Sequence, residues 1–212
     1  MGDMVGGEGV DLMQEEEEAI YARHPAGVAG CLKRATVGIA GLGGLGSAVA
    51  TALARSGVGR MVLVDFDMVE ASNLNRQHYF CDQIGRPKAE VLKENLRRIN
   101  PFLEYEAHHA RITAENASEW FGGVDVLVEA LDRADQKAML LNACRGVPVV
   151  AASGLAGLAS CASIGVRKMG EKLFVVGDFE SEMSQGVLAS RVGVVASMQA
   201  HLVVRILMGA EG

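Results

Sequence analysis

The stretch TVGIAGLGGLGSAVATALARSG, residues 36–57, decides the fold of this 212-residue chain. Its first five residues are apolar or small, as in a buried β-strand. A glycine-rich segment, Gly41 to Gly46, then leads into a helical pattern whose apolar residues share one face: Leu45, Val49, Ala52 and Leu53. A strand, a glycine loop and a helix in this order are typical of a nucleotide-binding βα unit.

The same alternation continues along the chain. We predict further strands and helices from residue 61 to residue 153: strands over 61–65, 103–108, 124–130 and 147–153, and helices over 88–100, 114–121 and 134–144. This pattern predicts an α/β, Rossmann-like fold with a mostly parallel sheet covered by helices.

Beyond residue 153 the pattern changes to two shorter strands, 160–168 and 172–178, which favour an antiparallel extension of the sheet. Residues 190–209 are apolar on nearly every side. We expect them to form a C-terminal helix that is buried, either in the core or against a second subunit.

The length favours a single domain, because 212 residues are few for a cofactor domain and a separate substrate domain. Residues 1–13 are rich in glycine and acidic residues, and we expect them to be disordered. The run Glu15 to Glu18 is expected to open or solvate a short helix that ends near Pro25. We therefore expect one folded domain over residues 14–212.

Composition and charge exclude several classes of protein. Half of the residues are hydrophobic and 22% are charged, which excludes intrinsic disorder and coiled coils. The formal net charge of −6 disfavours a nucleic-acid partner. The N-terminus lacks the pattern of a secretory signal, so we expect a cytoplasmic protein.

Two further features bear on metals and membranes. The four cysteines form no CxxC pair, so we expect no zinc site. Residues 146–166 carry no charge, but they are rich in Gly, Ala and Ser and include Pro148. Buried strands are a better interpretation of this segment than a membrane span, and no membrane partner is expected.

The segment Gly41-Leu42-Gly43-Gly44-Leu45-Gly46 matches GxGxxG between a predicted strand and a predicted helix. Its glycines let the backbone approach a phosphate, and the helix N-terminus offers unpaired N–H groups to the anion. Asp65 ends the second strand, where a carboxylate can accept hydrogen bonds from ribose hydroxyls. These residues alone fit NAD and ATP equally well.

The polar segment DFDMVEASNLNRQ, residues 65–77, and GRPKAE, residues 85–90, favour ATP. Arg76 and Lys88 would bring two cations toward the phosphate loop. Nucleotidyl transfer needs such preorganised cations, because charge develops on phosphate oxygens in the transition state. Either residue alone would be read as a solvated surface cation.

Asp132 follows the predicted strand 124–130 at the edge of the sheet where ligands bind. It could coordinate Mg²⁺ that bridges ATP phosphates. Glu129 and Asp135 are neighbours that could substitute for it. The competing role for Asp132 is a helix N-cap.

Taken together, GLGGLG, residues 65–77, GRPK and ALDRAD (130–135) resemble the ThiF/MoeB/HesA family, the bacterial relatives of ubiquitin-activating enzymes. The resemblance covers residues 20 to 209. Three more segments are similar to the short ThiF-like proteins of thiamine biosynthesis: 152–157, 191–200 and 203–209. The resemblance implies a dimeric adenylation domain that uses ATP and Mg²⁺ to adenylate the C-terminal glycine of a ubiquitin-like sulfur carrier.

The family's site residues are carried over by position. The resemblance implies nucleotide-binding roles for eight residues: Gly41, Gly43, Gly44, Gly46, Asp65, Asp67, Asn73 and Gln77. It implies catalytic roles for Arg76, Lys88, Asp132 and Arg23, with Asp132 also the magnesium ligand. Arg23 matches an arginine that reaches across the dimer in the family.

The chain departs from the family in two places. The two CxxC pairs that bind zinc in larger members are missing, and Glu182 and its neighbours stand where some members carry a sulfur-bearing cysteine. Adenylation does not need that cysteine, but the departure leaves a covalent sulfur intermediate at that position without support.

Three alternatives stay open at this point. One is an NAD-dependent oxidoreductase that uses the same glycine loop and Asp65. Another is a nucleotide-binding scaffold without catalysis. The third is adenylation of a small carbonyl or tRNA-linked substrate, against which the net charge argues mildly.

Overall fold

The computed structural model describes residues 7–210 and contains a seven-stranded sheet in the order β3-β2-β1-β4-β5-β7-β6. Its strands, in chain order, are β1 (Thr36–Ala40), β2 (Arg60–Asp65), β3 (Glu104–His109), β4 (Val126–Glu129), β5 (Val149–Ala152), β6 (Gly165–Lys168) and β7 (Leu173–Gly177). All neighbours pair in parallel except β6 and β7. The predicted α/β fold with an antiparallel extension is confirmed.

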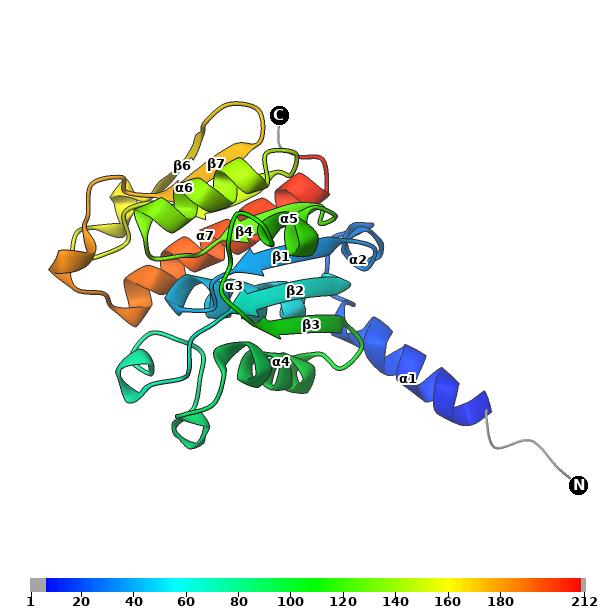
Figure 1. Ribbon diagram of the computed structural model, residues 1–212. Helices are drawn as coiled ribbons and strands as arrows, with labels where there is room; N and C mark the ends of the chain where they lie inside the picture. Colours follow the sequence, from blue (N-terminus) through cyan, green and yellow to red (C-terminus); the bar gives the residue numbers. More distant parts are fainter. Residues whose placement is uncertain (1–6, 211–212) are drawn as a thin grey trace, which may run out of the picture.

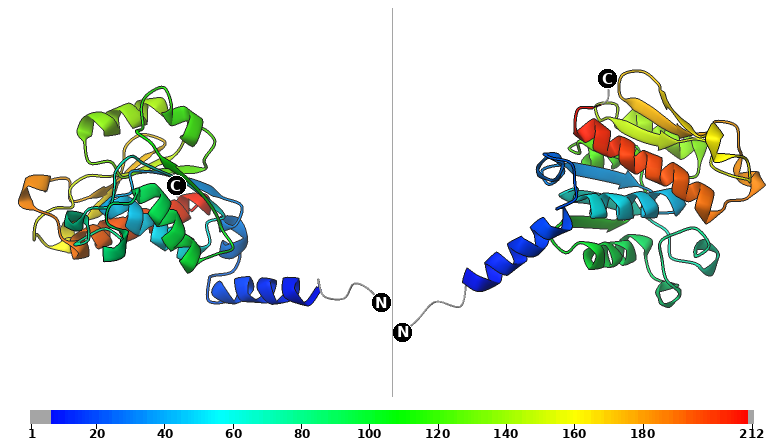
Figure 2. Two further views of the ribbon diagram at one scale, coloured as in Figure 1. Left: turned by 60° about the horizontal axis from the view of Figure 1, so that its bottom comes forward. Right: turned by 180° about the vertical axis from the view of Figure 1, so that it is seen from behind.

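Helices cover both faces of this sheet (Figures 1 and 2). On one face lie α3 (Gly44–Ser56), α4 (Lys88–Ile99) and α7 (Ala189–Leu207), which share one apolar cluster with the sheet. On the other face lie α5 (Ala117–Phe121) and α6 (Ala134–Ala143), in a smaller cluster around Phe121 and Leu140. Four short 3-10 helices lie in the connections: η1 (Ala71–Asn73), η2 (Cys81–Gln83), η3 (Cys161–Ser163) and η4 (Met183–Gln185).

The C-terminal helix α7 is a core helix of this chain. Val195, Ala196 and Val203 are fully or almost fully buried against the sheet and α3. Ser197 and His201 on its other side are exposed. The predicted buried helix is confirmed, and burial against its own sheet accounts for its apolar composition.

The N-terminal segment differs from the expectation of disorder over residues 1–13. Residues 7–13 belong to α1 (Gly7–Ile20), which extends away from the sheet (Figures 1 and 2), whereas residues 1–6 lie outside the described residues. The acidic run from residue 15 to residue 18 lies inside this helix and not at its start. A turn and α2 (Val28–Leu32) follow before β1.

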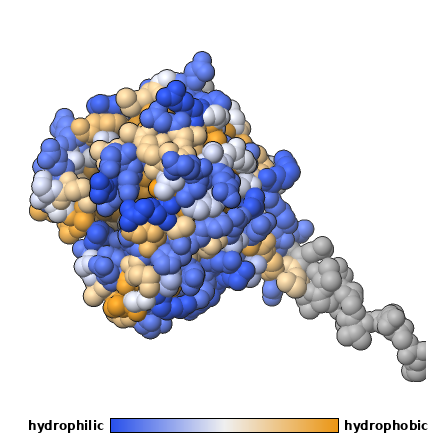
Figure 3. All heavy atoms as spheres, in the orientation of Figure 1, coloured by the Kyte–Doolittle hydropathy of each residue, from blue (hydrophilic) through white to orange (hydrophobic). Residues whose placement is uncertain are grey.

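The sequence analysis also made predictions about cysteines, metal sites and membrane spans. All four cysteines are free thiols. Within the described part of the chain, no cluster of three or more His, Cys, Asp or Glu side chains is arranged to hold a metal ion. None of the helices in residues 7–210 has the length and apolar composition that a membrane crossing needs. The face shown in Figure 3 is largely hydrophilic, with apolar patches between.

Candidate functional site

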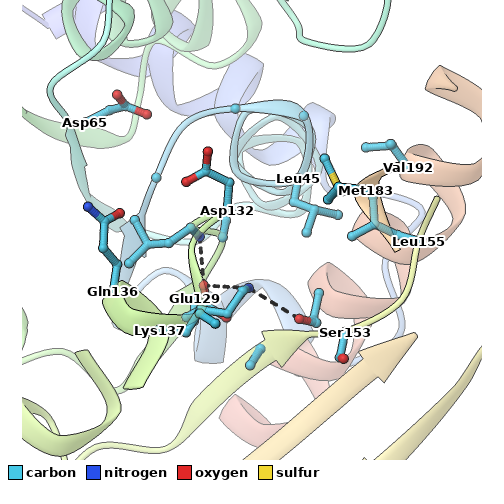
Figure 4. A pocket seen from close by; sticks show the side chains of 18 of the residues that line it. Leu45, Asp65, Glu129, Asp132, Gln136, Lys137, Ser153, Leu155, Met183 and Val192 are labelled. Carbon is cyan, nitrogen blue, oxygen red and sulfur yellow. Dashed lines mark hydrogen bonds and ion pairs between the residues drawn. The ribbon is translucent and has the colours of Figure 1, made fainter. Parts of the chain in front are cut away.

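A cavity of about 1270 Å³ lies where the parallel strands end, between the start of α3, the segment after β2 and helix α6. It contains nearly all of the site residues predicted from the sequence: Gly41, Gly43, Gly44, Asp65, Asp67, Asn73, Arg76, Gln77, Lys88 and Asp132. Figure 4 shows Asp65, Asp132 and Gln136 around one part of this cavity and Leu155, Met183 and Val192 around another. The spacing along the sequence therefore predicted a set of residues that meet in space.

The glycine loop adopts a conformation that needs its glycines. Gly41 has a φ of 87°, and a Cβ there would lie 2.7 Å from the carbonyl oxygen of Ala130. A Cβ on Gly46 would lie 1.9 Å from the carbonyl oxygen of Gly41, so Gly46 allows close packing of α3 on the loop and does not line the cavity. Gly43 caps α3 without a side-chain hydrogen bond, which leaves the first N–H groups of α3 without a side-chain acceptor.

Asp65 fixes the glycine loop from the end of β2. Its Oδ2 accepts a hydrogen bond from Leu42 N at 2.6 Å, and its Oδ1 accepts one from Asp67 N at 2.7 Å. Burial raises the pKa of Asp65 above its ordinary value, although these hydrogen bonds and the nearby Lys88 oppose the shift. Each carboxylate oxygen keeps a second lone pair, so Asp65 can still accept from a ribose hydroxyl.

Tyr79 also holds the loop, and the sequence analysis did not identify it. Its hydroxyl donates to the carbonyl oxygen of Leu42 at 2.7 Å, and its side chain is buried. Burial, with Asp65 and Asp67 nearby, raises the pKa of Tyr79, so the hydroxyl stays a donor. An aromatic residue next to a polar stretch was the available signal, but only the fold shows that its hydroxyl reaches Leu42.

Lys88 and Arg76 bring their positive charges to the cavity as predicted. The Lys88 side chain is only 5% exposed, and its Nζ lies 2.9 Å from Oδ2 of Asp67. Arg76 Nη1 donates to Ser72 O at 3.0 Å and to Asn75 Oδ1 at 2.7 Å, and the Cγ of Arg76 lies beside Gly44 at the start of α3. Two cations therefore border the wall formed by the glycine loop.

Two amides complete this wall. Asn73 and Gln77 are each only 8% exposed and line the cavity. The Oδ1 of Asn73 accepts from Glu70 N at 3.1 Å, so this amide orders its own turn. The Oε1 of Gln77 is buried and has no hydrogen-bond partner among the described residues. A buried acceptor of this kind is rare without a ligand or water, and it suits a donor group on a bound nucleotide.

The acidic residues around β4 are not equivalent. Asp132 is exposed and its carboxylate points into the cavity (Figure 4). The N-cap of α6 is Arg133, without a side-chain cap, so the structure does not support the alternative that Asp132 caps this helix. Glu129 is fully buried, with both oxygens on Lys137 Nζ at 2.9 and 2.8 Å. Asp135 pairs with Arg133 and does not line the cavity.

A single exposed carboxylate suits Mg²⁺ that takes its other ligands from ATP phosphates and water. Glu129 is unsuited to this role, because Lys137 and Leu131 N already engage its oxygens. Burial raises the pKa of Glu129, and Lys137 opposes that shift. Among these acidic residues the geometry favours Asp132 as the candidate metal ligand.

Arg23 lies away from this cavity. It sits in the turn after α1, two residues beyond Tyr21, whose ring packs beside Gly57 at the C-terminal end of α3. The glycine loop is at the other end of α3, about 20 Å away for a 13-residue helix. Arg23 therefore cannot act in the cavity of its own chain as folded here, and its predicted role across a dimer stays a prediction.

The sequence analysis also missed a buried ion pair that fixes the segment after β7, which lines the cavity with Phe179 and Ser181. Asp178, just after β7, pairs with Arg191 of α7, and both are almost fully buried. Asp178 Oδ1 also accepts from Ser181 N at 2.8 Å and Glu180 N at 2.9 Å. The signal in the sequence was the same as for Asp65, an acidic residue at the end of an apolar strand.

Comparisons with known proteins agree with this fold. The chain is 40% identical over 129 residues to tRNA threonylcarbamoyladenosine dehydratase of Bacillus subtilis, a match that covers 59% of this chain and 51% of that protein. It is 41% identical over 122 residues to a sulfur carrier protein adenylyltransferase of Thermus thermophilus, covering 56% of this chain and 45% of that protein. The chain thus spans about half the length of these curated relatives.

Among solved structures, tRNA N6-threonylcarbamoyladenosine dehydratase of E. coli in complex with AMP has the same fold, with a TM-score of 0.84 and 23% identity. That match covers 94% of this chain and 97% of the other. The model of the ThiF family matches residues 21–212, which include every site residue described above. This protein belongs to the ThiF family.

Proposed function

We propose that this protein is a cytoplasmic, ATP-dependent adenylyltransferase that activates the C-terminal glycine of a ThiS-like sulfur carrier for thiamine biosynthesis. The observation that carries the proposal is the composition of one cavity wall. The N-terminus of α3 without a side-chain cap, the acceptor Asp65 and the cations Arg76 and Lys88 all border the same space. A nucleoside triphosphate needs all three kinds of group: N–H donors, an acceptor for the ribose and cations for the phosphates.

In this reaction the carboxylate of the carrier attacks the α-phosphorus of ATP. A bond forms between a carboxylate oxygen and phosphorus, and the bond to the β-phosphate oxygen breaks, releasing pyrophosphate and an acyl-adenylate. Asp65 and Gln77 bind the nucleoside, and the loop amides bind phosphate oxygens. Arg76 and Lys88 neutralise the charge that develops in the transition state. Asp132 would hold Mg²⁺, which neutralises phosphate charge when bound.

Exchange of labelled pyrophosphate into ATP, dependent on a carrier that ends in Gly-Gly, tests the proposal. We expect exchange by the wild type and a loss of about 100-fold in Arg76→Ala, as for other transition-state donors. Arg98→Ala, on the exposed side of α4, is the matched control and should retain full exchange. Undiminished exchange in Arg76→Ala, or none in the wild type, contradicts the proposal.

A tRNA-linked substrate is the second candidate. It is favoured by the full-length similarity to the fold of the E. coli dehydratase, which covers 94% of this chain. The net charge of −6 is unfavourable for a tRNA backbone. If modified tRNA supports exchange and the carrier does not, adenylation remains and the substrate assignment changes.

An NAD-dependent oxidoreductase would bind NAD, which also fits the glycine loop. Calorimetry with ATP and with NAD distinguishes the adenylyltransferase from the oxidoreductase. We expect heat of binding from ATP alone. A scaffold without catalysis would bind ATP and the carrier but release no pyrophosphate.

The role of Asp132 is tested by the metal dependence of exchange. Asp132→Asn should need a higher Mg²⁺ concentration for half-maximal exchange, because one anionic ligand is lost. Asp135→Asn is the matched control on the same turn, and its Mg²⁺ dependence should follow the wild type. A shift in Asp135→Asn instead would move the metal site to that residue.

We also propose a homodimer in which Arg23 of one subunit reaches the site of the other, and one experiment tests both points. Arg23→Ala and Arg76→Ala should each lose exchange, and a mixture of the two should recover part of it. Recovery occurs only if Arg23 of one subunit completes the site of the other, because the mixed dimer then contains one intact site. No recovery in a confirmed mixed dimer would exclude action across subunits.

A further inference from the structure

The segment between β2 and α4, residues 66–87, brings Arg76 to the cavity, although little of it is regular structure. It contains the short helices η1 and η2 and forms two loops beyond the first turns of α3 and α4 (Figure 1). Arg76 lies against Gly44 at the start of α3, because a Cβ on that glycine would be 3.6 Å from both the Cγ and the carbonyl oxygen of Arg76. The position of Arg76 therefore depends on the contacts that fasten this segment to α3.

His78, two residues after Arg76, is fastened to the first two turns of α3. Its backbone N donates to Ser47 Oγ at 3.1 Å, and its Nδ1 lies 3.2 Å from Thr51 Oγ1. Ser47 and Thr51 are four residues apart on α3, so their hydroxyls lie on the same side of the helix. One residue of the segment thus meets two hydroxyls of α3.

The protons of these two hydroxyls are already committed to α3. Ser47 Oγ donates to Gly43 O at 2.6 Å, and Thr51 Oγ1 donates to Ser47 O at 2.9 Å. Each hydroxyl has one proton and two lone pairs, so each oxygen can only accept from His78. His78 is therefore the donor in both contacts, from its backbone N and from Nδ1, and two directed hydrogen bonds fix its place on α3.

The glycine loop does not depend on the Ser47 hydroxyl. Gly43 O also accepts from Ser47 N at 3.1 Å, and Tyr79 separately holds Leu42 O. The His78 N–H does depend on it, because no other acceptor for this N–H is present in residues 7–210. Ser47 is fully buried and is not among the residues that line the cavity. Loss of its hydroxyl should thus loosen the segment that carries Arg76 and leave the loop amides in place.

We propose that Ser47 is a positioning residue, which acts through His78 to hold Arg76 at the place beside the glycine loop that the transition state requires. The proposal rests on the proposed function, because Arg76 neutralises charge only in that reaction. Displacement of such a group by about 1 Å can cost as much as about 100-fold in rate. Since Ser47 does not line the cavity, its contribution lies in kcat and not in the binding of ATP.

A double-substitution cycle with Arg76 tests the proposal. Pyrophosphate exchange with ATP and a carrier that ends in Gly-Gly is measured for the wild type, Ser47→Ala, Arg76→Ala and the double variant. Ser47→Ala should lower kcat about tenfold and leave the KM for ATP unchanged. In the Arg76→Ala background the same substitution should have no further effect on kcat, because the side chain that it positions is absent.

Ser56→Ala is the matched control on the same helix. Ser56 Oγ donates to Ala52 O at 2.9 Å, which is the same kind of bond one turn back along α3. Ser56 is the last residue of α3, and this bond does not reach residues 66–87. Ser56→Ala should therefore keep the wild-type kcat, so a loss in Ser47→Ala cannot come from weakening α3 in general.

Thr51→Val tests the second contact of His78 and keeps the shape of the side chain. It removes the acceptor of His78 Nδ1 and leaves the bond to Ser47. It should lower kcat by a smaller factor than Ser47→Ala, and again only while Arg76 is present. If Ser47→Ala does not fold, as judged by urea unfolding, the cycle of Thr51→Val with Arg76→Ala decides the proposal.

The possible failures are distinguishable. If the wild type shows no exchange, the proposed function fails and the role of Ser47 fails with it. If the wild type exchanges normally and Ser47→Ala keeps its kcat, Ser47 does not position Arg76 and adenylation stands. The same conclusion follows if Ser47→Ala lowers kcat by an equal factor with and without Arg76, or if it raises the KM for ATP and leaves kcat unchanged.

Discussion

Asp65 and Asp178 occupy the same kind of position, but only Asp65 lines the cavity. Each ends or follows an apolar parallel strand, and each is 7% exposed. Asp65 contacts two backbone N–H groups and lines the cavity. Asp178 accepts from Ser181 and Glu180, pairs with Arg191 and does not line the cavity.

The difference between them is the buried guanidinium. Burial raises the pKa of Asp65. Burial acts in the same direction on Asp178, but its hydrogen bonds to Ser181 and Glu180 and its contact with Arg191 outweigh it and hold the pKa well below the ordinary value. A strand-end carboxylate that pairs with a buried cation fixes the segments around it. A strand-end carboxylate without such a partner can still accept a hydrogen bond from a ligand.

Asp178→Asn should give the largest effect on stability. It leaves Arg191, which is 3% exposed, without a counter-charge, and an unpaired buried charge costs about 3–5 kcal/mol. The free energy of unfolding, measured with urea, should fall by this amount. Asp135→Asn breaks the exposed pair with Arg133, 66% exposed on each side, and should cost less than about 1 kcal/mol. Equal losses would contradict the structural role of Asp178.

Asp65→Asn should affect ATP binding more than stability, the reverse of Asp178→Asn. Its main loss is the charged acceptor for the nucleotide, which is worth about 1.5–3 kcal/mol, so affinity for ATP should fall by about ten- to a hundredfold. The free energy of unfolding should change less than in Asp178→Asn. The reason is that the buried Lys88 keeps its ion pair with Asp67, so the substitution leaves no buried cation unpaired. Calorimetry and urea unfolding of the same samples measure both. A greater loss of stability than of affinity would place Asp65 with Asp178.

Tyr79→Phe should give a smaller effect on the same loop. It removes the hydrogen bond to Leu42 O and should lower the free energy of unfolding by about 1 kcal/mol, with a few-fold loss of ATP affinity. Tyr105→Phe is the matched control, because its buried hydroxyl donates to Asn100 O at 2.9 Å, away from the cavity. It should cost similar stability and leave ATP affinity unchanged.

The sequence predicted the regular elements and one wall of the cavity because both depend on short-range patterns. The strand at 61–65 and the helix at 88–100 agree with β2 and α4 to within one residue at each end. The glycine loop follows from backbone conformation, which a local GxGxxG pattern determines. Asp65 and Lys88 follow from where neighbouring elements end or begin.

The side of the cavity formed by β6 and the segment after β7 could not be predicted, because it depends on contacts between segments that the pattern does not connect. Arg191 looked like one residue of an apolar helix, and only the fold brings it to Asp178. Arg167 looked like a strand residue, and only the register beside Val175 turns it toward the cavity.

The smallest effect should come from mild acid, and it separates the two carboxylates by pH. The stability that Asp178 contributes is fully present above its unfolded pKa of about 3.9 and is lost only as the pH falls through its lower folded value. Asp65, whose folded pKa is raised, is protonated first as the pH falls and then accepts ribose hydroxyls less well. ATP affinity should therefore fall at a pH where the Asp178 contribution to the free energy of unfolding is intact. Titration of both quantities from pH 8 to pH 5 in the wild type and Asp65→Asn checks this, because protonation of ATP itself is common to the two proteins. Parallel affinity curves would mean that Asp65 does not contact the nucleotide.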